Sequence, residues 1–195
     1  MSVFENRPAS PGQDWEYRWA AYDEPTYRAV LAQILPTDVV IEIGAGDLRL
    51  AYALSGIAQK VYALEINPQV LERGLACGRS SSRLVPICAD ARALPFPRDV
   101  TVGVLLMRHC THFRLYAEKL KQAGVERLVT NARWRMDVEC VALNAPRPAY
   151  EQIDLGWYAC WCGKVGFKSG PAEKITPELD AIINDVCDCP DCGKN

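Results

Sequence analysis

The stretch VVIEIGAGD, residues 39–47, decides the fold that this sequence predicts. It is a near-continuous apolar run that ends in two glycines, and such a run is typical of a strand buried on both faces of a sheet. Gly44 and Gly46 allow the backbone to turn tightly and leave room for a ligand beside it. The stretch therefore predicts a buried strand followed at once by a ligand-binding turn.

Strands and helices are predicted to alternate on both sides of this stretch. Before it, Asp23 is a helix cap with Pro25 in the first turn, and apolar residues follow helical spacing until Pro36. We expect further helices over residues 50–57, from Pro68 and over 113–123, and further strands over residues 61–66, 83–90, 99–107, 126–134 and 138–143. This order predicts an α/β fold with an open, mostly parallel sheet, in which ligands bind outside the carboxyl ends of the strands.

Acidic residues end the two strands that follow the glycine turn. Glu65 stands 21 residues after Gly44, where a carboxylate can accept both hydroxyls of a ribose. Asp90 ends the next strand, where a carboxylate can accept a hydrogen bond from an adenine amino group. A nicotinamide dinucleotide is the competing cofactor, but its fingerprint needs a third glycine where Arg49 stands. The pattern therefore favours a nucleoside-containing cofactor other than a nicotinamide.

With VVIEIGAGD, VYALEINP (61–68) and ICADARALPF (87–96), the sequence resembles the class I S-adenosylmethionine-dependent methyltransferases over residues 25–132. Within that family it looks most like the ribosomal RNA adenine dimethylases. The resemblance implies a doubly wound, Rossmann-like sheet, with the methionine end of the cofactor over the glycine turn, its ribose on Glu65 and its adenine beside Asp90 and Ala91. The cofactor residues that we expect on this basis are Glu42, Gly44, Ala45, Gly46, Glu65, Ile66, Asp90, Ala91 and Met107.

The stretch MRHCTHF, residues 107–113, follows the fourth predicted strand and holds the chain's two histidines. In the family, enzymes that methylate base amino groups carry Asn/Asp-Pro-Pro-Tyr here, whereas this sequence has Met-Arg-His-Cys. Arg108 and His109 are the catalytic candidates, with His109 a general base toward an oxygen or thiol acceptor. The alternative for His109 is a solvated loop, and His112 is expected to begin a helix. A metal pair is disfavoured because a third ligand is missing.

Arginines are frequent after this stretch, and they bear on the methyl acceptor. The set is Arg108, Arg114, Arg127, Arg133, Arg135 and Arg147, with Trp134 among them. Arg133 and Arg135 flank the end of the fifth predicted strand, where such a patch can hold phosphates and stack a base. The alternative is a salt-bridged surface with Asp137 and Glu139. RNA is therefore the first hypothesis for the methyl acceptor. The net charge of −2, however, differs from the positive charge that is usual for RNA-binding proteins.

Two other functional readings stay open. The chain can be a methyltransferase that acts on a small molecule or a protein, which the absent Asn-Pro-Pro-Tyr motif favours. It can also be a protein that binds the cofactor or a partner without catalysis, because an acceptor-site motif is missing.

Cysteines gather near the end of the sequence, with five of the nine in the last 36 residues. Cys189-Pro-Asp-Cys192-Gly has the form of a zinc knuckle, and Cys160-x-Cys162-Gly looks like a knuckle shortened by one residue. The segment resembles a zinc ribbon with a structural zinc on these four thiolates. Cys187 is a spare that can replace one ligand, and free thiols are the alternative.

Composition sets the expected organisation of the chain. Residues 101–150 hold eight Lys/Arg against four Asp/Glu, and residues 151–195 hold four against eight. We therefore expect an N-terminal arm over 1–24, a methyltransferase domain over 25–145 and a zinc-ribbon-like module over 150–195. The arm is expected to cover the donor pocket with Trp19 and Tyr22. Without a secretory signal or an apolar run of ~20 residues, we expect a cytoplasmic protein with no membrane segment; the oligomeric state is not indicated.

Overall fold

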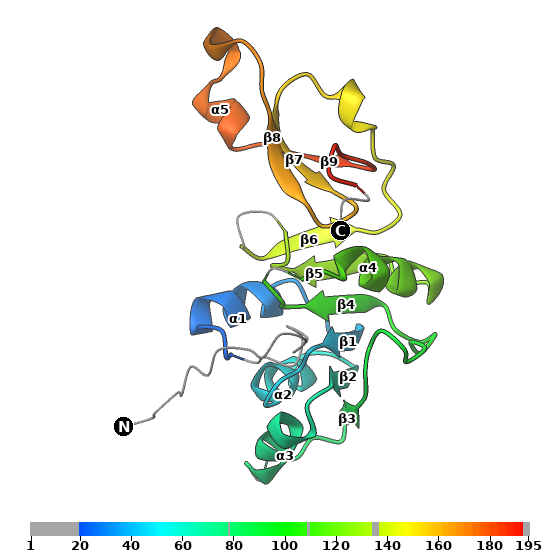
Figure 1. Cartoon of the computed structure of the whole chain (residues 1–195). Coiled ribbons are helices and arrows are strands. Elements are labelled where there is room, and N and C mark those ends of the chain that lie inside the picture. Colours follow the sequence, from blue (N-terminus) through cyan, green and yellow to red (C-terminus); the bar gives the residue numbers. More distant parts are fainter. Residues whose placement is uncertain (1–19, 78, 109, 134–136, 193–195) are drawn as a thin grey trace, which may run out of the picture.

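The computed structural model describes residues 20–77, 79–108, 110–133 and 137–192. Its larger sheet has six strands in the order β3-β2-β1-β4-β5-β6 (Figure 1). The strands are β1 (Val39–Ile43), β2 (Lys60–Glu65), β3 (Leu84–Cys88), β4 (Val102–Leu105), β5 (Arg127–Thr130) and β6 (Glu139–Ala142). All neighbouring strands pair in parallel except β5 and β6, which are antiparallel. The predicted α/β class with a mostly parallel sheet is confirmed.

Helices cover both faces of this sheet. They are α1 (Glu24–Leu31), α2 (Arg49–Ser55), α3 (Pro68–Ala76) and α4 (Phe113–Gln122). Side chains from α1, α2 and α3 pack with Val40, Val61 and Val102 on one face. On the other face, Phe113 and Leu120 of α4 pack with alternate residues of the same strands. This two-sided burial explains the continuous apolar run of β1, whose five residues are all buried.

Local signals in the sequence mark the helix ends as expected. The Asp23 side chain accepts the Thr26 N–H at 3.0 Å, and the Asn67 side chain accepts the Gln69 N–H at 3.1 Å. Gly124, with a φ of +90°, follows the end of α4. These contacts satisfy backbone groups that a helix end leaves without partners.

β4 and β5 end earlier than the sequence predicts, and this affects the site. β4 ends at Leu105 rather than Met107, and β5 ends at Thr130. The Thr130 hydroxyl donates to the Leu105 carbonyl at 2.7 Å, so a side chain satisfies the group at the strand end. Residues 106–108 are thereby released from the ladder and form part of the loop at the carboxyl edge.

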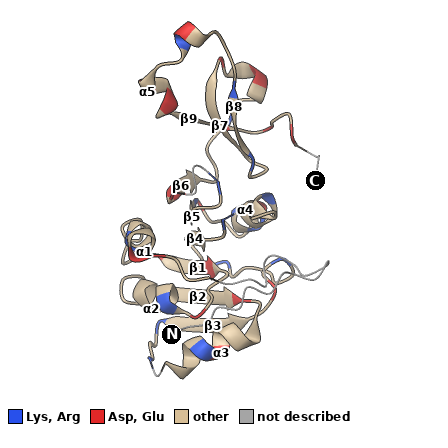
Figure 2. Cartoon of the chain, turned by 60° about the vertical axis from the view of Figure 1, so that its left-hand side comes forward, with Lys and Arg blue, Asp and Glu red and all other residues tan. Residues whose placement is uncertain are grey.

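A second, three-stranded sheet follows the first in the chain. It contains β7 (Gly156–Cys160), β8 (Val165–Lys168) and β9 (Ile183–Val186) in the order β8-β7-β9. The connecting segments hold 3-10 turns at Tyr150–Gln152 and Ala172–Lys174 and the short helix α5 (Pro177–Asp180). This sheet lies beyond β6 and α4 in Figure 1, and acidic residues mark its connecting segments in Figure 2. Among the described residues, none of the helices has the length and apolarity needed to cross a bilayer.

Candidate functional site

A cavity of about 460 Å³ lies at the carboxyl edge of the large sheet. Its wall combines the ends of β1 and β2, the loop after β4 and residues 20–27 before and within α1. Expected site residues in this wall are Glu42, Gly44, Ala45, Glu65, Met107 and Arg108. The carboxyl ends of parallel strands meet at one edge, so residues far apart in sequence come together here.

The glycine turn depends on backbone conformations that favour glycine. Gly44 and Gly46 have φ values of +77° and +57°, and the N–H groups of Gly44 and Ala45 both donate to the Leu64 carbonyl. A Cβ on Gly44 would stand 3.3 Å from Met107 Cε. The turn therefore lets two strand ends approach closely while its surface faces the cavity.

Sequence reasoning missed two residues that support this turn. Leu48 is fully buried with a φ of +64°, a conformation that costs a non-glycine residue free energy. A Cβ on Gly74 would collide with the Asp47 carbonyl, so α3 packs directly on the turn. The helical spacing around Gly74 was visible in the sequence, but its contact with the turn depends on the tertiary fold.

Glu65 holds the turn and also lines the cavity. Its Oε2 accepts the Gly46 N–H at 2.8 Å, and its Oε1 accepts the Asn67 N–H at 2.8 Å. Burial raises the pKa of this carboxyl, and the backbone N–H groups partly oppose that rise. Each oxygen retains a second lone pair, so the carboxylate can still accept two hydroxyl groups from a ligand.

Glu42 is buried in the cavity wall, and one of its two carboxylate oxygens lacks a hydrogen-bond partner among the described residues. It is 4% exposed, and its Oε2 has no hydrogen-bond partner in the described part of the chain. Burial, together with the charges of Glu65 and Asp47, raises the pKa of this carboxyl to about 8. A cationic or hydrogen-bond-donating ligand group would satisfy Oε2 and favour the ionised form.

The remaining expected cofactor residues line a smaller hollow of about 20 Å³. Ile66, Asp90 and Ala91 meet there with Met107 and Gly44, which belong to both walls. Arg92 donates to both oxygens of Asp90, and these hydrogen bonds lower the pKa of the Asp90 carboxyl despite its partial burial. Arg92 was not expected at this site from the sequence. Its guanidinium competes with an adenine amino group for the Asp90 side chain.

Arg108 and residues 20–27, which include the end of the N-terminal arm, meet in the wall of the cavity. The Arg108 N–H donates to Tyr22 Oη at 3.1 Å, and the guanidinium lies 5.1 Å from the centroid of that ring. The Tyr22 N–H in turn donates to Tyr27 Oη at 3.3 Å. Tyr22 therefore lines the cavity, whereas Trp19 and His109 lie outside the described residues. His112 is the N-cap residue of α4, so it begins a helix as the sequence predicts.

Arg133 does not contribute to the exposed arginine patch that was expected after β5. Arg133 has a fully buried side chain and pairs with Glu139 at 3.0 Å, which is the structural alternative. Arg127 lies at the amino end of β5 and pairs with Asp38. The Arg147 guanidinium lies 4.4 Å from the Trp161 ring centroid. Trp134 and Arg135 lie outside the described residues. These arginines bind other parts of the protein because the fold brings distant partners to them.

Four cysteines form a compact cluster at the edge of the small sheet. They are Cys160, Cys162, Cys189 and Cys192, whose sulfur atoms all lie within 4.8 Å of one another. Three of the Sγ–Sγ distances are 3.5, 3.6 and 3.7 Å. A tetrahedral ion with metal–sulfur bonds of about 2.3 Å needs sulfur atoms roughly 3.8 Å apart. The donor set fits zinc, and the exposed Cys187 is not part of the cluster.

Backbone groups support the cluster as they do in metal knuckles. The Cys162 N–H donates to Cys160 Sγ at 3.5 Å, and the Cys189 N–H donates to Cys192 Sγ at 3.3 Å. Burial raises the pKa of the Cys160 thiol and raises that of Cys189 to about 11. A bound cation would oppose this effect, because metal ligands are deprotonated.

The sheet, its two-sided helices and the cavity at its carboxyl edge define a Rossmann-like methyltransferase fold. Residues 41–127 match the family described as a methyltransferase domain. No curated protein matches the sequence.

Three solved structures with a similar arrangement of strands and helices can be compared with this chain. They are precorrin 8W decarboxylase of Methanobacterium thermoautotrophicum (18% identity, 57% of this chain and 63% of that chain, TM-score 0.49), a dimethyladenosine transferase from Plasmodium falciparum (20%, 55% and 41%, 0.49) and the 23S rRNA methyltransferase ErmE (19%, 56% and 46%, 0.49). The chain spans less than two thirds of the length of each of these proteins.

Proposed function

We propose that the chain is an S-adenosylmethionine-dependent methyltransferase whose cofactor occupies the large cavity, with its adenine toward the adjoining hollow. The observation that carries this proposal is the pair of buried carboxylates, Glu42 and Glu65, on a glycine turn within a matched methyltransferase domain. We also propose the division into an N-terminal arm (1–24), a methyltransferase domain (25–145) and a metal-binding module (150–195).

The chemistry of the cavity wall fits the groups of the cofactor. S-adenosylmethionine supplies an electrophilic methyl group on a sulfonium, and it carries an ammonium, a ribose diol and an adenine. The unpartnered Oε2 of Glu42 can accept a bond from the ammonium, and Glu65 can accept the two ribose hydroxyls. Ile66 and Ala91, which line the adjoining hollow, offer apolar contacts to an adenine placed beside it. Gly44 and Ala45 leave the space in which the methionine end lies.

The acceptor enters beside Tyr22, Tyr27 and Arg108 in this proposal. These residues line the same cavity as the two carboxylates and are joined by hydrogen bonds across its mouth. Arg108 can orient an anionic or hydrogen-bond-accepting group of the acceptor. His109 remains a candidate base in this loop on sequence grounds alone.

RNA loses part of its support as the acceptor, because three of the six arginines in the expected set (Arg127, Arg133 and Arg147) are engaged within the protein. A protein that bound RNA would need exposed cations to neutralise phosphates. We therefore favour a small molecule or a protein side chain that reaches the cavity. Transfer of labelled methyl into fractionated cell extract decides among RNA, protein and small-molecule acceptors, and label in none would favour a binding protein without catalysis.

Calorimetry with S-adenosylhomocysteine tests the cofactor site. Wild type is expected to bind, and Glu65→Ala is expected to weaken binding by roughly 100-fold, because two charge-assisted hydrogen bonds and the support of the turn are lost. Asp99→Asn, an exposed acid at the far end of the sheet, is the matched control and is expected to bind normally. No binding by wild type, or normal binding by Glu65→Ala, would overturn the proposed cofactor site.

We further propose one zinc per chain on the four cysteines. Elemental analysis of purified protein is expected to give about one zinc, and Cys162→Ser is expected to lose most of it. Cys187→Ser is the matched control, since that thiol is exposed beside the cluster and outside it. A folded wild type without metal would end this assignment.

A further inference from the structure

The turn that carries two of the four cysteines lies against the first residue of α4. The Trp161 ring meets the ring of Phe113 edge-on, with centroids 6.5 Å apart and planes at 83°. Gly163 has a φ of +94°, and a Cβ there would stand only 2.9 Å from Phe113 Cβ. Phe113 is fully buried. The turn Cys160–Gly163 and the start of α4 are therefore in contact without room for adjustment.

The same apolar cluster extends from this turn to the wall of the cofactor cavity. Phe113, Trp161, Met107 and Cys110 belong to one packed group. The Cys110 N–H donates to the Met107 carbonyl at 3.1 Å, which ties the loop before α4 into a turn. Met107 contacts both hollows of the site, so a shift of Phe113 changes the wall against which the cofactor lies.

Two arginines contact the aromatic rings of Trp161 and Phe113. The Arg147 guanidinium lies 4.4 Å from the Trp161 ring centroid, and that of Arg133 lies 5.0 Å from the Phe113 ring centroid. Arg133 also pairs with Asp185 of β9 at 2.8 Å. Asp185 precedes Val186, and the Val186 carbonyl accepts a hydrogen bond from the backbone N–H of Trp161 at 3.0 Å. Cation–ring contacts and an ion pair thus join the cysteine-bearing sheet to the large sheet.

We propose that Trp161 is a positioning residue, through which the metal-bound cysteine turn fixes Phe113 and the Met107–Arg108 wall of the cofactor cavity. The metal holds Cys160 and Cys162 at a fixed separation, and this fixes the course of the chain between them. Release of the metal frees the turn, and the contact between Trp161 and Phe113 is lost with it. Metal binding and cofactor binding are therefore coupled. This inference rests on the proposed function of both sites.

Three variants separate this role from a general loss of stability. Metal-loaded Trp161→Ala is expected to keep its zinc but to bind S-adenosylhomocysteine at least about fivefold more weakly, the lower end of coupling between two sites. Trp161→Phe keeps an aromatic edge against Phe113 and is expected to restore most of the affinity. Trp157→Ala is the control, because that ring contacts Phe167 in the same small sheet, and it is expected to keep both zinc and affinity. Wild-type affinity in metal-loaded Trp161→Ala would overturn the inference.

Amide hydrogen exchange of wild type, with and without metal, provides a second measurement that needs no cofactor. On removal of zinc by a chelator, exchange is expected to rise at least about tenfold over residues 106–116. Strands β1 and β2 are the internal reference and are expected to change little. Unchanged exchange over 106–116, or an equal rise in β1 and β2, would overturn the coupling. Absence of zinc or of S-adenosylhomocysteine binding in wild type would instead contradict the proposed function.

Discussion

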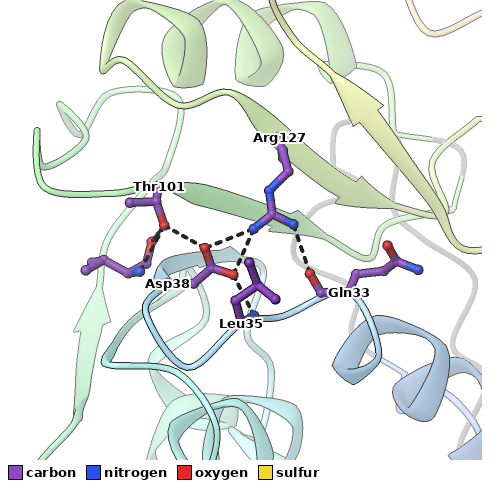
Figure 3. A network of polar contacts seen from close by, with 6 residues as sticks. Gln33, Leu35, Asp38, Thr101 and Arg127 are labelled. Carbon is purple, nitrogen blue, oxygen red and sulfur yellow. Dashed lines mark hydrogen bonds and ion pairs between the residues drawn. The ribbon is translucent and has the colours of Figure 1, made fainter.

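Two carboxylates at opposite ends of β1 have the same burial and very different surroundings. Asp38 comes directly before β1 and Glu42 lies near its end, and each is 4% exposed. Both oxygens of Asp38 accept bonds from Arg127, at 2.9 and 2.8 Å. The Thr101 hydroxyl and the Leu35 N–H also donate to it, at 3.0 and 2.7 Å. Figure 3 shows this network, in which Arg127 also donates to the Gln33 carbonyl.

The carboxyl end of the same sheet leaves comparable groups without partners. Oε2 of Glu42 and both polar side-chain atoms of buried Asn131 lack hydrogen bonds among the described residues. A buried polar group without a partner costs free energy, so such groups are rare unless something else binds them. The amino end is therefore built for stability alone, whereas the carboxyl end retains binding capacity that a ligand can use.

The largest expected effect is the loss of the cation at the amino end. Arg127→Met removes the guanidinium and leaves the Asp38 carboxylate buried with fewer donors. We expect the free energy of unfolding to fall by about 4 kcal/mol, as when one partner of a buried ion pair is removed. Urea denaturation at neutral pH measures this change. Arg114→Met is the control because its pair with Glu118 is exposed, and it is expected to change stability little.

Equal loss in the two variants would contradict the assignment of the amino end as a structural network.

Replacing each of the two carboxylates with its isosteric amide tests the difference between the amino and carboxyl ends of the sheet. Asp38→Asn weakens the bonds from Arg127 and is expected to cost roughly 2 to 3 kcal/mol. Glu42→Gln removes an acid that is already protonated at neutral pH, and it is expected to cost less than about 1 kcal/mol or to stabilise the protein. The same Glu42→Gln protein should bind S-adenosylhomocysteine more weakly, because an amide cannot ionise toward the ammonium. Large destabilisation by Glu42→Gln would show that its unpartnered oxygen is not available to a ligand.

The dependence of stability on pH follows from the raised pKa of Glu42. In the folded protein this pKa is about 8, against an ordinary value of 4.5. Between these values the folded chain holds a proton that the unfolded chain has released, so stability falls as pH rises. We expect a loss of roughly 2 kcal/mol between about pH 6 and about pH 8 from this group. Urea denaturation over this range should give a flatter profile for Glu42→Gln and an unchanged one for Asp99→Asn.

Local sequence signals were sufficient for much of the fold. Caps such as Asp23 and Asn67, and the apolar run of β1, act over a few residues and were read correctly. The cysteine knuckles are also local, because each pair is two or three residues apart. The grouping of Glu42, Glu65 and Met107 at one edge follows from strand order, which alternation of strands and helices indicates.

The sequence did not indicate which charged and polar side chains pair with one another in the folded protein. Arg127 and its partner Asp38 are 89 residues apart, and both are polar residues beside strands in the sequence. Arg133 follows the end of β5 as expected, yet its guanidinium is buried against Glu139 and Asp185 rather than facing a ligand. Likewise, the unpartnered state of Glu42 depends on what surrounds it in space. Residue type identifies a possible donor or acceptor, and only packing decides which groups remain available.

The smallest expected effect comes from the hydroxyl that links Asp38 to β1. Thr101 Oγ1 donates to Asp38 Oδ1 and accepts the Val39 N–H, each at 3.0 Å. Thr101→Val keeps the shape but leaves the Val39 N–H without its acceptor, and we expect a loss of about 1 kcal/mol. Thr101→Ser retains the hydroxyl and is expected to recover most of that loss. If the two variants were equally stable, the hydroxyl would add nothing to the network, and Arg127 and the Leu35 N–H would suffice for Asp38.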